Sequence, residues 1–254
     1  MNRILLESTE VNDGRATFDG ARAEHVLNVL HGEVGQILKT GVVDGPVGTS
    51  VIEKIEPLPP NPETGLAQGR VTVRCEHGSE AVPPWVDLVL APPRPRAMKR
   101  LLPQLVQMGV GRIVLVGAEK VEKAFWGAQL LKEQVYRPLL LDGLMQAGTT
   151  ALPVIQIEKS FRRYLEGGRF EEDFAGQPRR VLAHPYVREG TRPIVPFDTG
   201  ARTVVAIGPE GGWTDEEVEK LEGHGFRRLS LGPRILRTDT AAIALLARLM
   251  PTAV

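Results

Sequence analysis

The sequence predicts an α/β fold, with a parallel sheet over residues 85–254 preceded by a small β-barrel over residues 1–77. Three observations support this prediction. Short apolar stretches separated by turn-forming residues fill the first part, as in small barrels. After Trp85, predicted strands and helices alternate, which is typical of a parallel sheet covered by helices. Residues 76–84 are polar and end in two prolines, as expected of a linker.

The first part is predicted to consist of short strands and one helix. Compact apolar stretches at residues 36–40 and 51–55 and an alternating stretch at residues 70–75 predict three strands. Residues 22–30 place aliphatic side chains on one helical face and predict a short helix. Turn-forming residues fill the loop at residues 57–65.

The second part begins with a near-continuous apolar run at residues 86–91, which predicts a strand covered on both faces. Apolar residues at three- and four-residue steps predict helices, and short apolar runs predict further strands. The helices are expected at residues 98–108, 126–146 and 241–250, and the strands at residues 113–116, 154–157, 180–183, 203–207 and 228–231.

Composition and charge exclude several classes of protein. No apolar run reaches the roughly 18 residues that cross a membrane, the first ten residues contain no signal-peptide core, and the single Cys75 offers neither a disulfide nor a metal cluster. We expect a cytoplasmic enzyme without a membrane segment or a metal.

The charged residues are unevenly distributed along the chain. Residues 1–80 hold 7 basic against 12 acidic side chains, whereas residues 81–254 hold 24 against 19. Any nucleic-acid contact is therefore expected mainly in the second part.

Three loops of the second part, at residues 184–185, 208–212 and 232–240, each follow a predicted strand. In open α/β sheets this edge is where ligands bind. The glycines of the second loop let its backbone approach a ligand closely. This loop carries Glu210 but no cation, so a ligand recognised by backbone hydrogen bonds is favoured over a triphosphate.

The residues around these loops support the same interpretation. Thr214 and Glu217 predict a capped helix directly after the second loop. The third loop carries Arg234 and Arg237 ahead of a predicted helix. Both arginines fit either surface salt bridges or contacts to a substrate or phosphate, and the neighbouring glycine loop favours the contacts.

The run Ile-Gly-Pro-Glu-Gly-Gly-Trp-Thr at residues 207–214, followed by Leu-Gly-Pro-Arg-Ile-Leu-Arg-Thr-Asp-Thr-Ala at residues 231–241, closely resembles the RsmE family. The resemblance implies an S-adenosylmethionine-dependent methyltransferase acting on N3 of a uridine in 16S ribosomal RNA, free or in the small ribosomal subunit. It also implies a SPOUT-type parallel sheet with a C-terminal trefoil knot, a PUA-like β-barrel that binds RNA, and a homodimer.

The resemblance also implies a site in which S-adenosylmethionine is held largely by backbone groups of the three loops. The implied cofactor-binding residues are Leu182, Ala183, His184, Ile207, Gly208, Pro209, Glu210, Gly211, Gly212, Leu231, Gly232, Ile235, Leu236, Thr238, Thr240 and Ala241. No metal site is implied.

Methylation of uracil N3 requires that this nitrogen lose its proton. We expect Arg237, with Arg234 as the second candidate, to stabilise the negative charge that develops on the uracil. Glu210 or Asp239 is the candidate general base. Glu210 fits equally well a role in orienting its own loop.

Several positions that are usually charged in the RsmE family are occupied here by Gln104, Gln107, Thr149 and His31. Two alternatives therefore stay open: a related SPOUT methyltransferase with another RNA target, and a homologue that binds S-adenosylmethionine and RNA without catalysis. A nucleotide-binding α/β enzyme is a further alternative, but no lysine follows the glycine loop to meet a phosphate.

Overall fold

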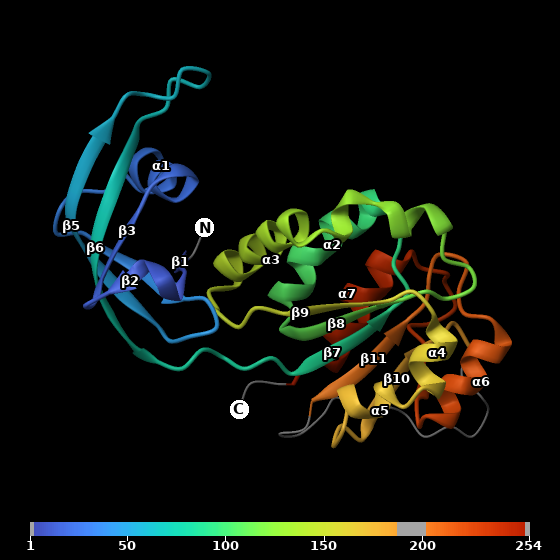
Figure 1. Ribbon diagram of the computed structural model, residues 1–254. Helices are drawn as coiled ribbons and strands as arrows, with labels where there is room; N and C mark the ends of the chain where they lie inside the picture. Colours follow the sequence, from blue (N-terminus) through green and yellow to red (C-terminus); the bar gives the residue numbers. More distant parts are fainter. Residues whose placement is uncertain (1–2, 187–201, 252–254) are drawn as a thin grey trace. The chain divides into compact units, whose positions relative to one another are not determined.

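The computed structural model describes residues 3–186 and 202–251, and the chain divides into two compact units (Figure 1). The first unit comprises Met1–Val82 and Leu144–Leu152. The second comprises Pro83–Gly143 and Pro153–Val254. Residues 144–152, which the sequence analysis assigns to the second domain, thus group with the first unit.

The first unit contains a six-stranded sheet in the order β1-β4-β5-β6-β3-β2. Its strands are β1 (Ile4–Leu6), β2 (Val11–Asn12), β3 (Arg15–Phe18), β4 (Ile37–Val42), β5 (Val47–Leu58) and β6 (Gln68–Ser79). Neighbouring strands are antiparallel except for the β1–β4 pair. The sequence predicts β4, β5, β6 and the helix α1 (Gly20–Asn28). It does not predict β1, β2 and β3, which are too short to show an alternating pattern.

The second unit contains a six-stranded parallel sheet in the order β12-β10-β11-β7-β8-β9. Its strands are β7 (Val86–Leu90), β8 (Val110–Val116), β9 (Val154–Glu158), β10 (Arg179–Ala183), β11 (Thr203–Ile207) and β12 (Arg227–Leu229). All residues of the neighbouring strands β7 and β11 are buried. This burial confirms the prediction of a parallel sheet covered on both faces.

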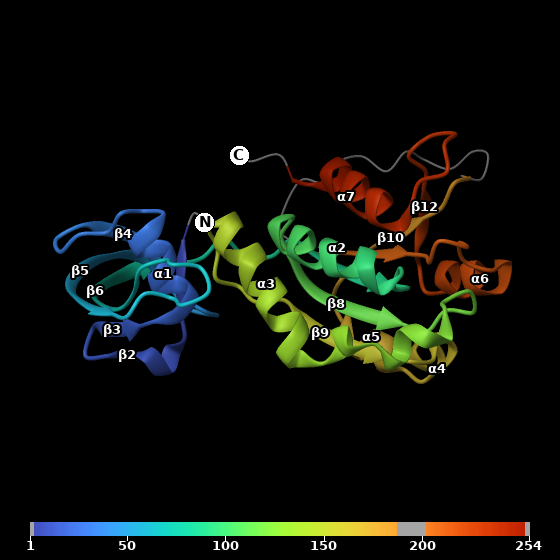
Figure 2. The ribbon, with the colours of Figure 1, turned by 90° about the horizontal axis from the view of Figure 1, so that it is seen from above.

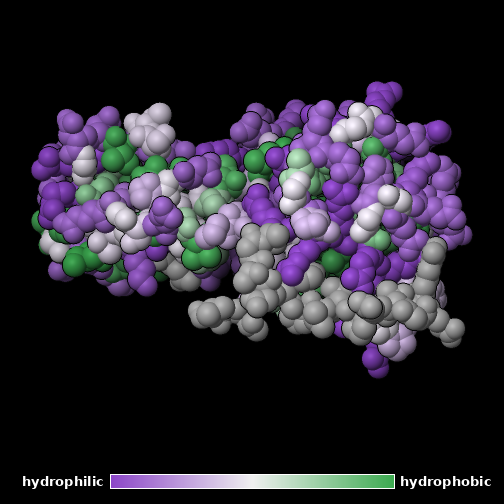
Figure 3. Space-filling view, turned by 90° about the horizontal axis from the view of Figure 1, so that it is seen from below, coloured by the Kyte–Doolittle hydropathy of each residue, from purple (hydrophilic) through white to green (hydrophobic). Residues whose placement is uncertain are grey.

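Helices cover both faces of this sheet (Figures 1 and 2). One face carries α2 (Pro95–Gln107) and α7 (Thr238–Leu249), which pack against each other. The other carries α4 (Phe161–Glu166), α5 (Arg169–Asp173) and α6 (Asp215–Gly223). Where the grey atoms do not cover it, the side of this unit seen from below is mostly hydrophilic (Figure 3).

The long helix predicted over residues 126–146 is shorter in the structure. Two 3₁₀ turns, η2 (Lys123–Gly127) and η3 (Gln129–Leu131), precede α3 (Glu133–Ala147). The backbone is extended at Ala128 and at Lys132, so the helix cannot run through either residue. The sequence prediction was wrong here because consecutive 3₁₀ turns also bury aliphatic residues at short intervals.

Two separate sets of polar contacts hold α5 and the residues after it against the sheet, at the end opposite the three loops. Asp87 on β7 is 1% exposed and accepts a hydrogen bond of 3.0 Å from the Gln177 side-chain amide. Asp173 on α5 accepts one from Arg112 at 2.7 Å and one from the Tyr164 hydroxyl at 2.9 Å. Burial, reinforced by the Asp173 carboxylate, raises the pKa of Tyr164, so this hydroxyl keeps its proton.

Candidate functional site

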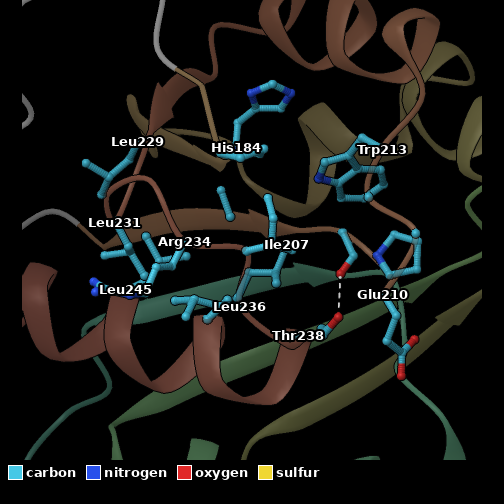
Figure 4. A pocket seen from close by; sticks show the side chains of 18 of the residues that line it. His184, Ile207, Glu210, Trp213, Leu229, Leu231, Arg234, Leu236, Thr238 and Leu245 are labelled. Atoms are coloured by element: carbon cyan, nitrogen blue, oxygen red, sulfur yellow. Dashed lines mark hydrogen bonds between the residues drawn. The ribbon is translucent and has the colours of Figure 1, made fainter.

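A cavity of about 290 Å³ opens at the carboxyl ends of β10, β11 and β12, where the three loops meet α7 (Figure 4). This volume is near the lower end of the range for small-molecule sites, roughly 300–1,000 Å³. The lining residues are Ala183, His184, Pro185, Ile207, Gly208, Pro209, Glu210, Gly211, Gly212, Trp213, Leu229, Leu231, Gly232, Arg234, Ile235, Leu236, Thr238, Ala241 and Leu245.

The structure brings nearly all of the expected cofactor-binding residues to this cavity. Leu182 and Thr240 are not among the lining residues: the first is buried within β10, and the second is exposed on α7. Of the candidate catalytic residues, Arg234 and Glu210 line the cavity. Arg237 does not, because it is the exposed N-cap residue of α7.

Four lining residues are missing from the sequence prediction. Pro185 directly follows the predicted residue His184, and Trp213 directly follows the predicted residue Gly212. Extending each predicted segment by one residue would have included them. Leu245 lies one helical turn beyond Ala241, so the helical period of α7 carries a signal for it. Leu229 lines the cavity from the end of β12. The sequence predicts this strand over residues 228–231, so it places the strand's carboxyl end at Leu231 instead of Leu229.

The glycine loop is folded around the Trp213 side chain. The indole is 7% exposed and contacts the Phe161 ring, with 5.2 Å between ring centroids. A Cβ atom on Gly208 would lie 3.1 Å from the indole ring, closer than ordinary van der Waals contact. The Gly208 carbonyl accepts a hydrogen bond of 3.1 Å from the Thr238 hydroxyl, which joins the second loop to the third (Figure 4).

The two glycines at the end of this loop differ in conformation. Gly212 has φ of 70°, in the left-handed region that favours glycine, whereas Gly211 does not lie in that region. The Gly211 carbonyl accepts a hydrogen bond of 3.0 Å from the Lys120 ammonium group. The loop is therefore fixed by a backbone turn at Gly212 and by a side-chain contact at Gly211.

The predicted capping box after the loop is confirmed, and its glutamate makes one further hydrogen bond outside the box. The Thr214 hydroxyl accepts from the Glu217 amide at 3.3 Å, and Glu217 Oε2 accepts from the Thr214 amide at 2.9 Å. Glu217 is 7% exposed, and its Oε1 accepts from the Glu119 amide at 2.8 Å. One carboxylate thus ties α6 to the segment after β8.

We expect Glu217→Ala to destabilise the protein more than Thr214→Ala. The first variant removes two part-buried hydrogen bonds, from the amides of Thr214 and Glu119, at roughly 0.5–1.5 kcal/mol each. The second removes one cap contact, at about 1 kcal/mol. Urea unfolding measures both, and Glu216→Ala is the matched control because its salt bridge to Lys220 is exposed. A Glu217→Ala variant as stable as this control would contradict the assignment.

The two candidate carboxylates both contact the N-terminal end of α2. Glu210 Oε1 accepts a hydrogen bond of 3.2 Å from the Arg94 amide, and its carboxylate points away from Ile207 and His184 (Figure 4). Asp239 lies 3.6 Å from the Arg100 guanidinium and accepts from the Thr240 amide at 2.9 Å. These contacts favour the loop-orienting role of Glu210 over general-base catalysis.

The polar groups at the cavity that lack partners are donors. Among residues 3–186 and 202–251, the Trp213 indole N–H is buried without a hydrogen-bond partner. Arg234, which lines the cavity, is not paired with an acidic side chain in the same part of the chain, and neither is Arg237, which lies outside the cavity. The cavity therefore offers donors to a ligand that brings acceptors or negative charge.

Within the described part of the chain, no helix is both long and apolar enough to cross a bilayer. The same residues contain no group of three or more His, Cys, Asp or Glu side chains that could hold a metal ion.

Comparison with known proteins assigns the chain to a class. A family model described as RNA methyltransferase domain matches residues 80–250, so the chain is an RNA methyltransferase. It is 30% identical over 268 residues to the ribosomal RNA small subunit methyltransferase E of Treponema pallidum, covering 100% of this chain and 92% of that protein. The chain therefore belongs to the ribosomal RNA small subunit methyltransferase E family, the RsmE family.

Solved structures share the fold. A putative methyltransferase from Legionella pneumophila, solved with bound S-adenosylmethionine, has a TM-score of 0.68 at 23% identity, covering 98% of this chain and 96% of that chain. A ribosomal RNA small subunit methyltransferase E from Neisseria gonorrhoeae, also bound to S-adenosylmethionine, has a TM-score of 0.68 at 21% identity, covering 97% and 95%.

Proposed function

We propose that this protein transfers the methyl group of S-adenosylmethionine to N3 of a uridine in 16S ribosomal RNA. Membership of the RsmE family supports this proposal. The observation that carries it is the cavity, which three loops form at the carboxyl edge of a parallel sheet. Glycine residues of these loops and the side chain of Arg234 line it. The substrate is the RNA alone or the small ribosomal subunit.

The lining of the cavity fits S-adenosylmethionine. Ile207, Leu231, Leu236 and Leu245 provide apolar surface for a flat base. The lack of a side chain at Gly208 leaves room beside the indole, where a Cβ would crowd the ring. The unpartnered Trp213 N–H offers a donor to an acceptor on the ligand. A nucleoside with a polar tail satisfies all of these features.

The residues of the chain would then bind and orient the reactants. S-adenosylmethionine supplies the electrophilic methyl group and its own leaving group when bound. Arg234, at the rim of the cavity, would face a uracil carbonyl oxygen and stabilise the charge left when N3 loses its proton. Arg237 is the second candidate for this role. Glu210 would orient the glycine loop through the Arg94 amide.

We also propose the finer features that the family suggests. The C-terminal segment would form a trefoil knot, and the hydrogen bond from Thr238 to Gly208 is compatible with threading of the third loop past the second. The first unit would be a PUA-like barrel that binds RNA. The protein would act in the cytoplasm, which cell fractionation tests. A crystal structure traced continuously from β10 to α7 tests the knot, and RNA binding by the intact chain with first-unit substitutions tests the barrel.

We expect a homodimer that covers one face of α7. The buried face of this helix includes Ala242, Leu245 and Leu249, which leaves Ile243 and Ala247 on the other face. The adjoining loop exposes Ile235 (75% exposed) and Leu236. Apolar surface of this kind marks an interface. Sedimentation at micromolar concentration checks the expectation, and a monomer would contradict it.

Mapping of modified uridines by mass spectrometry, with and without the protein, tests the function. N3 methylation at one position of 16S ribosomal RNA is expected. Methylation of another RNA would instead support a related methyltransferase. Calorimetric binding of S-adenosylmethionine without methylation of any RNA would indicate a non-catalytic homologue. An absence of S-adenosylmethionine binding would contradict the proposal.

A further inference from the structure

A cluster of basic side chains lies beside the cavity and outside the site described above. It consists of Arg94, Arg96, Lys99 and Arg100, at the N-terminal end of α2, and is called the basic strip here. All four residues are exposed. Residues 91–100 contain no acidic residue, although the net charge of the whole chain is zero. The basic strip is therefore a local excess of charge rather than a reflection of overall composition.

The basic strip opposes the electrostatic preference of its own helix. The N-terminus of a helix carries partial positive charge and favours acidic side chains. Here Arg94 is the N-cap residue, Arg96 follows within the first turn, and this turn contains no acidic residue. Arg96 and Arg100 also lie four residues apart, where like charges repel. Residues that break a local rule in this way are expected at functional surfaces.

Two contacts hold the basic strip at the rim of the cavity. The Arg94 amide donates to Glu210, which lines the cavity. Arg100 lies 3.6 Å from Asp239 in the first turn of α7, directly after the lining residue Thr238. The packing of α2 against α7 keeps this arrangement fixed (Figures 1 and 2).

The middle of the basic strip is available to a ligand. Arg94 is paired with Glu122 at 2.9 Å, and Arg100 faces Asp239. Within residues 3–186 and 202–251, Arg96 and Lys99 have no acidic side chain at salt-bridge distance. Two exposed cations thus stand next to the cavity without a partner, which is the arrangement that an anionic ligand requires.

We propose that the basic strip binds phosphate groups of the RNA strand next to the nucleotide that enters the cavity. This inference rests on the proposed function. Any target nucleotide within an RNA strand has a phosphate on each side, so the surface that borders the cavity must face backbone charge. Guanidinium and ammonium groups are the usual phosphate contacts, and they fix the position of the strand without reading its sequence.

The test compares charge reversals in the full-length protein. Arg96→Glu combined with Lys99→Glu removes the unpaired cations. Arg163→Glu, a single charge reversal, is the control for position and is compared with Arg96→Glu alone as well as with the double variant. Arg163 is an exposed cation on α4, which covers the other face of the sheet. Binding of a 16S ribosomal RNA transcript is measured at several salt concentrations, together with S-adenosylmethionine affinity, melting temperature and methylation kinetics.

The double variant is expected to bind the transcript about tenfold more weakly. The slope of log affinity against log salt concentration should become shallower by roughly one to two. The control should leave both the affinity and this slope unchanged. Affinity for S-adenosylmethionine and turnover at saturating RNA should be preserved. The melting temperature should stay the same or rise, because glutamate suits a helix N-terminus. A merely structural role of these cations predicts a lower melting temperature instead.

RNA affinity and salt slope equal to those of the unmodified protein would overturn the inference. A changed oligomeric state with unchanged RNA affinity would overturn it too, because the basic strip would then contact protein. A different result would contradict the proposed function, namely that the unmodified protein does not bind S-adenosylmethionine or does not methylate RNA. Since RNA binding is measured without catalysis, the two failures are distinguishable.

Discussion

Gly208→Val is expected to weaken the binding of S-adenosylmethionine by about 100-fold or more, which corresponds to roughly 2.7 kcal/mol. A Cβ atom at this position would lie 3.1 Å from the Trp213 indole and 3.2 Å from its backbone nitrogen. Neither group can easily withdraw, because the indole is buried against Phe161 and the backbone leads into the capped helix α6. The methyl groups of valine would therefore crowd the cavity or displace the ring that forms its wall.

Calorimetry with S-adenosylmethionine and S-adenosylhomocysteine measures this effect, and the melting temperature shows whether the variant folds. Gly127→Val is the matched control, because a Cβ on Gly127 meets no neighbour and the residue lies outside the cavity. Gly208→Ala, which adds the Cβ alone, is a milder second variant in case the valine prevents folding. Unchanged affinity in a folded Gly208→Val variant would show that the glycine loop is only a connection.

Long buried elements of the fold could be predicted from the sequence. The strands β7 and β11 are near-continuous apolar runs, in which only Asp87 and Thr203 are polar, because both faces of the sheet are covered. Such a run is visible in a short window of sequence. The helices α4 and α5 have only 6 and 5 residues, too few for a helical period to emerge. They were not predicted because the aromatic packing that stabilises them comes from residues elsewhere in the chain.

The site was predictable as far as its motifs extend. The loops that follow β10, β11 and β12 lie together because parallel strands end at the same edge of the sheet. The contact of Glu210 with Arg94 joins residues 116 positions apart, and no spacing rule indicates it. The choice between the two arginines has the same limit. The sequence favours Arg237 as the residue that stabilises the uracil anion, whereas Arg234 is the one that lines the cavity. Arg237 lies outside because it is the N-cap residue of α7.

Arg234→Lys is expected to lower turnover on the order of 10²–10³-fold while affinity for S-adenosylmethionine stays within a few-fold. If Arg234 stabilises the uracil anion, the ammonium group of lysine cannot replace the planar guanidinium, which donates two parallel hydrogen bonds. Arg237→Lys is the comparison, because Arg237 is exposed on the same loop but does not line the cavity. It is expected to retain most of the activity.

The dependence on pH separates this catalytic role from a structural one. Raising the pH increases the fraction of uracil N3 that has already lost its proton, so less stabilisation of the anion is needed. The turnover of the unmodified protein divided by that of the variant should therefore fall toward one as the pH is raised from neutral to alkaline. A structural Arg234 predicts a constant ratio, a lower melting temperature and weaker S-adenosylmethionine binding. If Arg237→Lys instead shows the loss and the alkaline recovery, the catalytic assignment moves to Arg237.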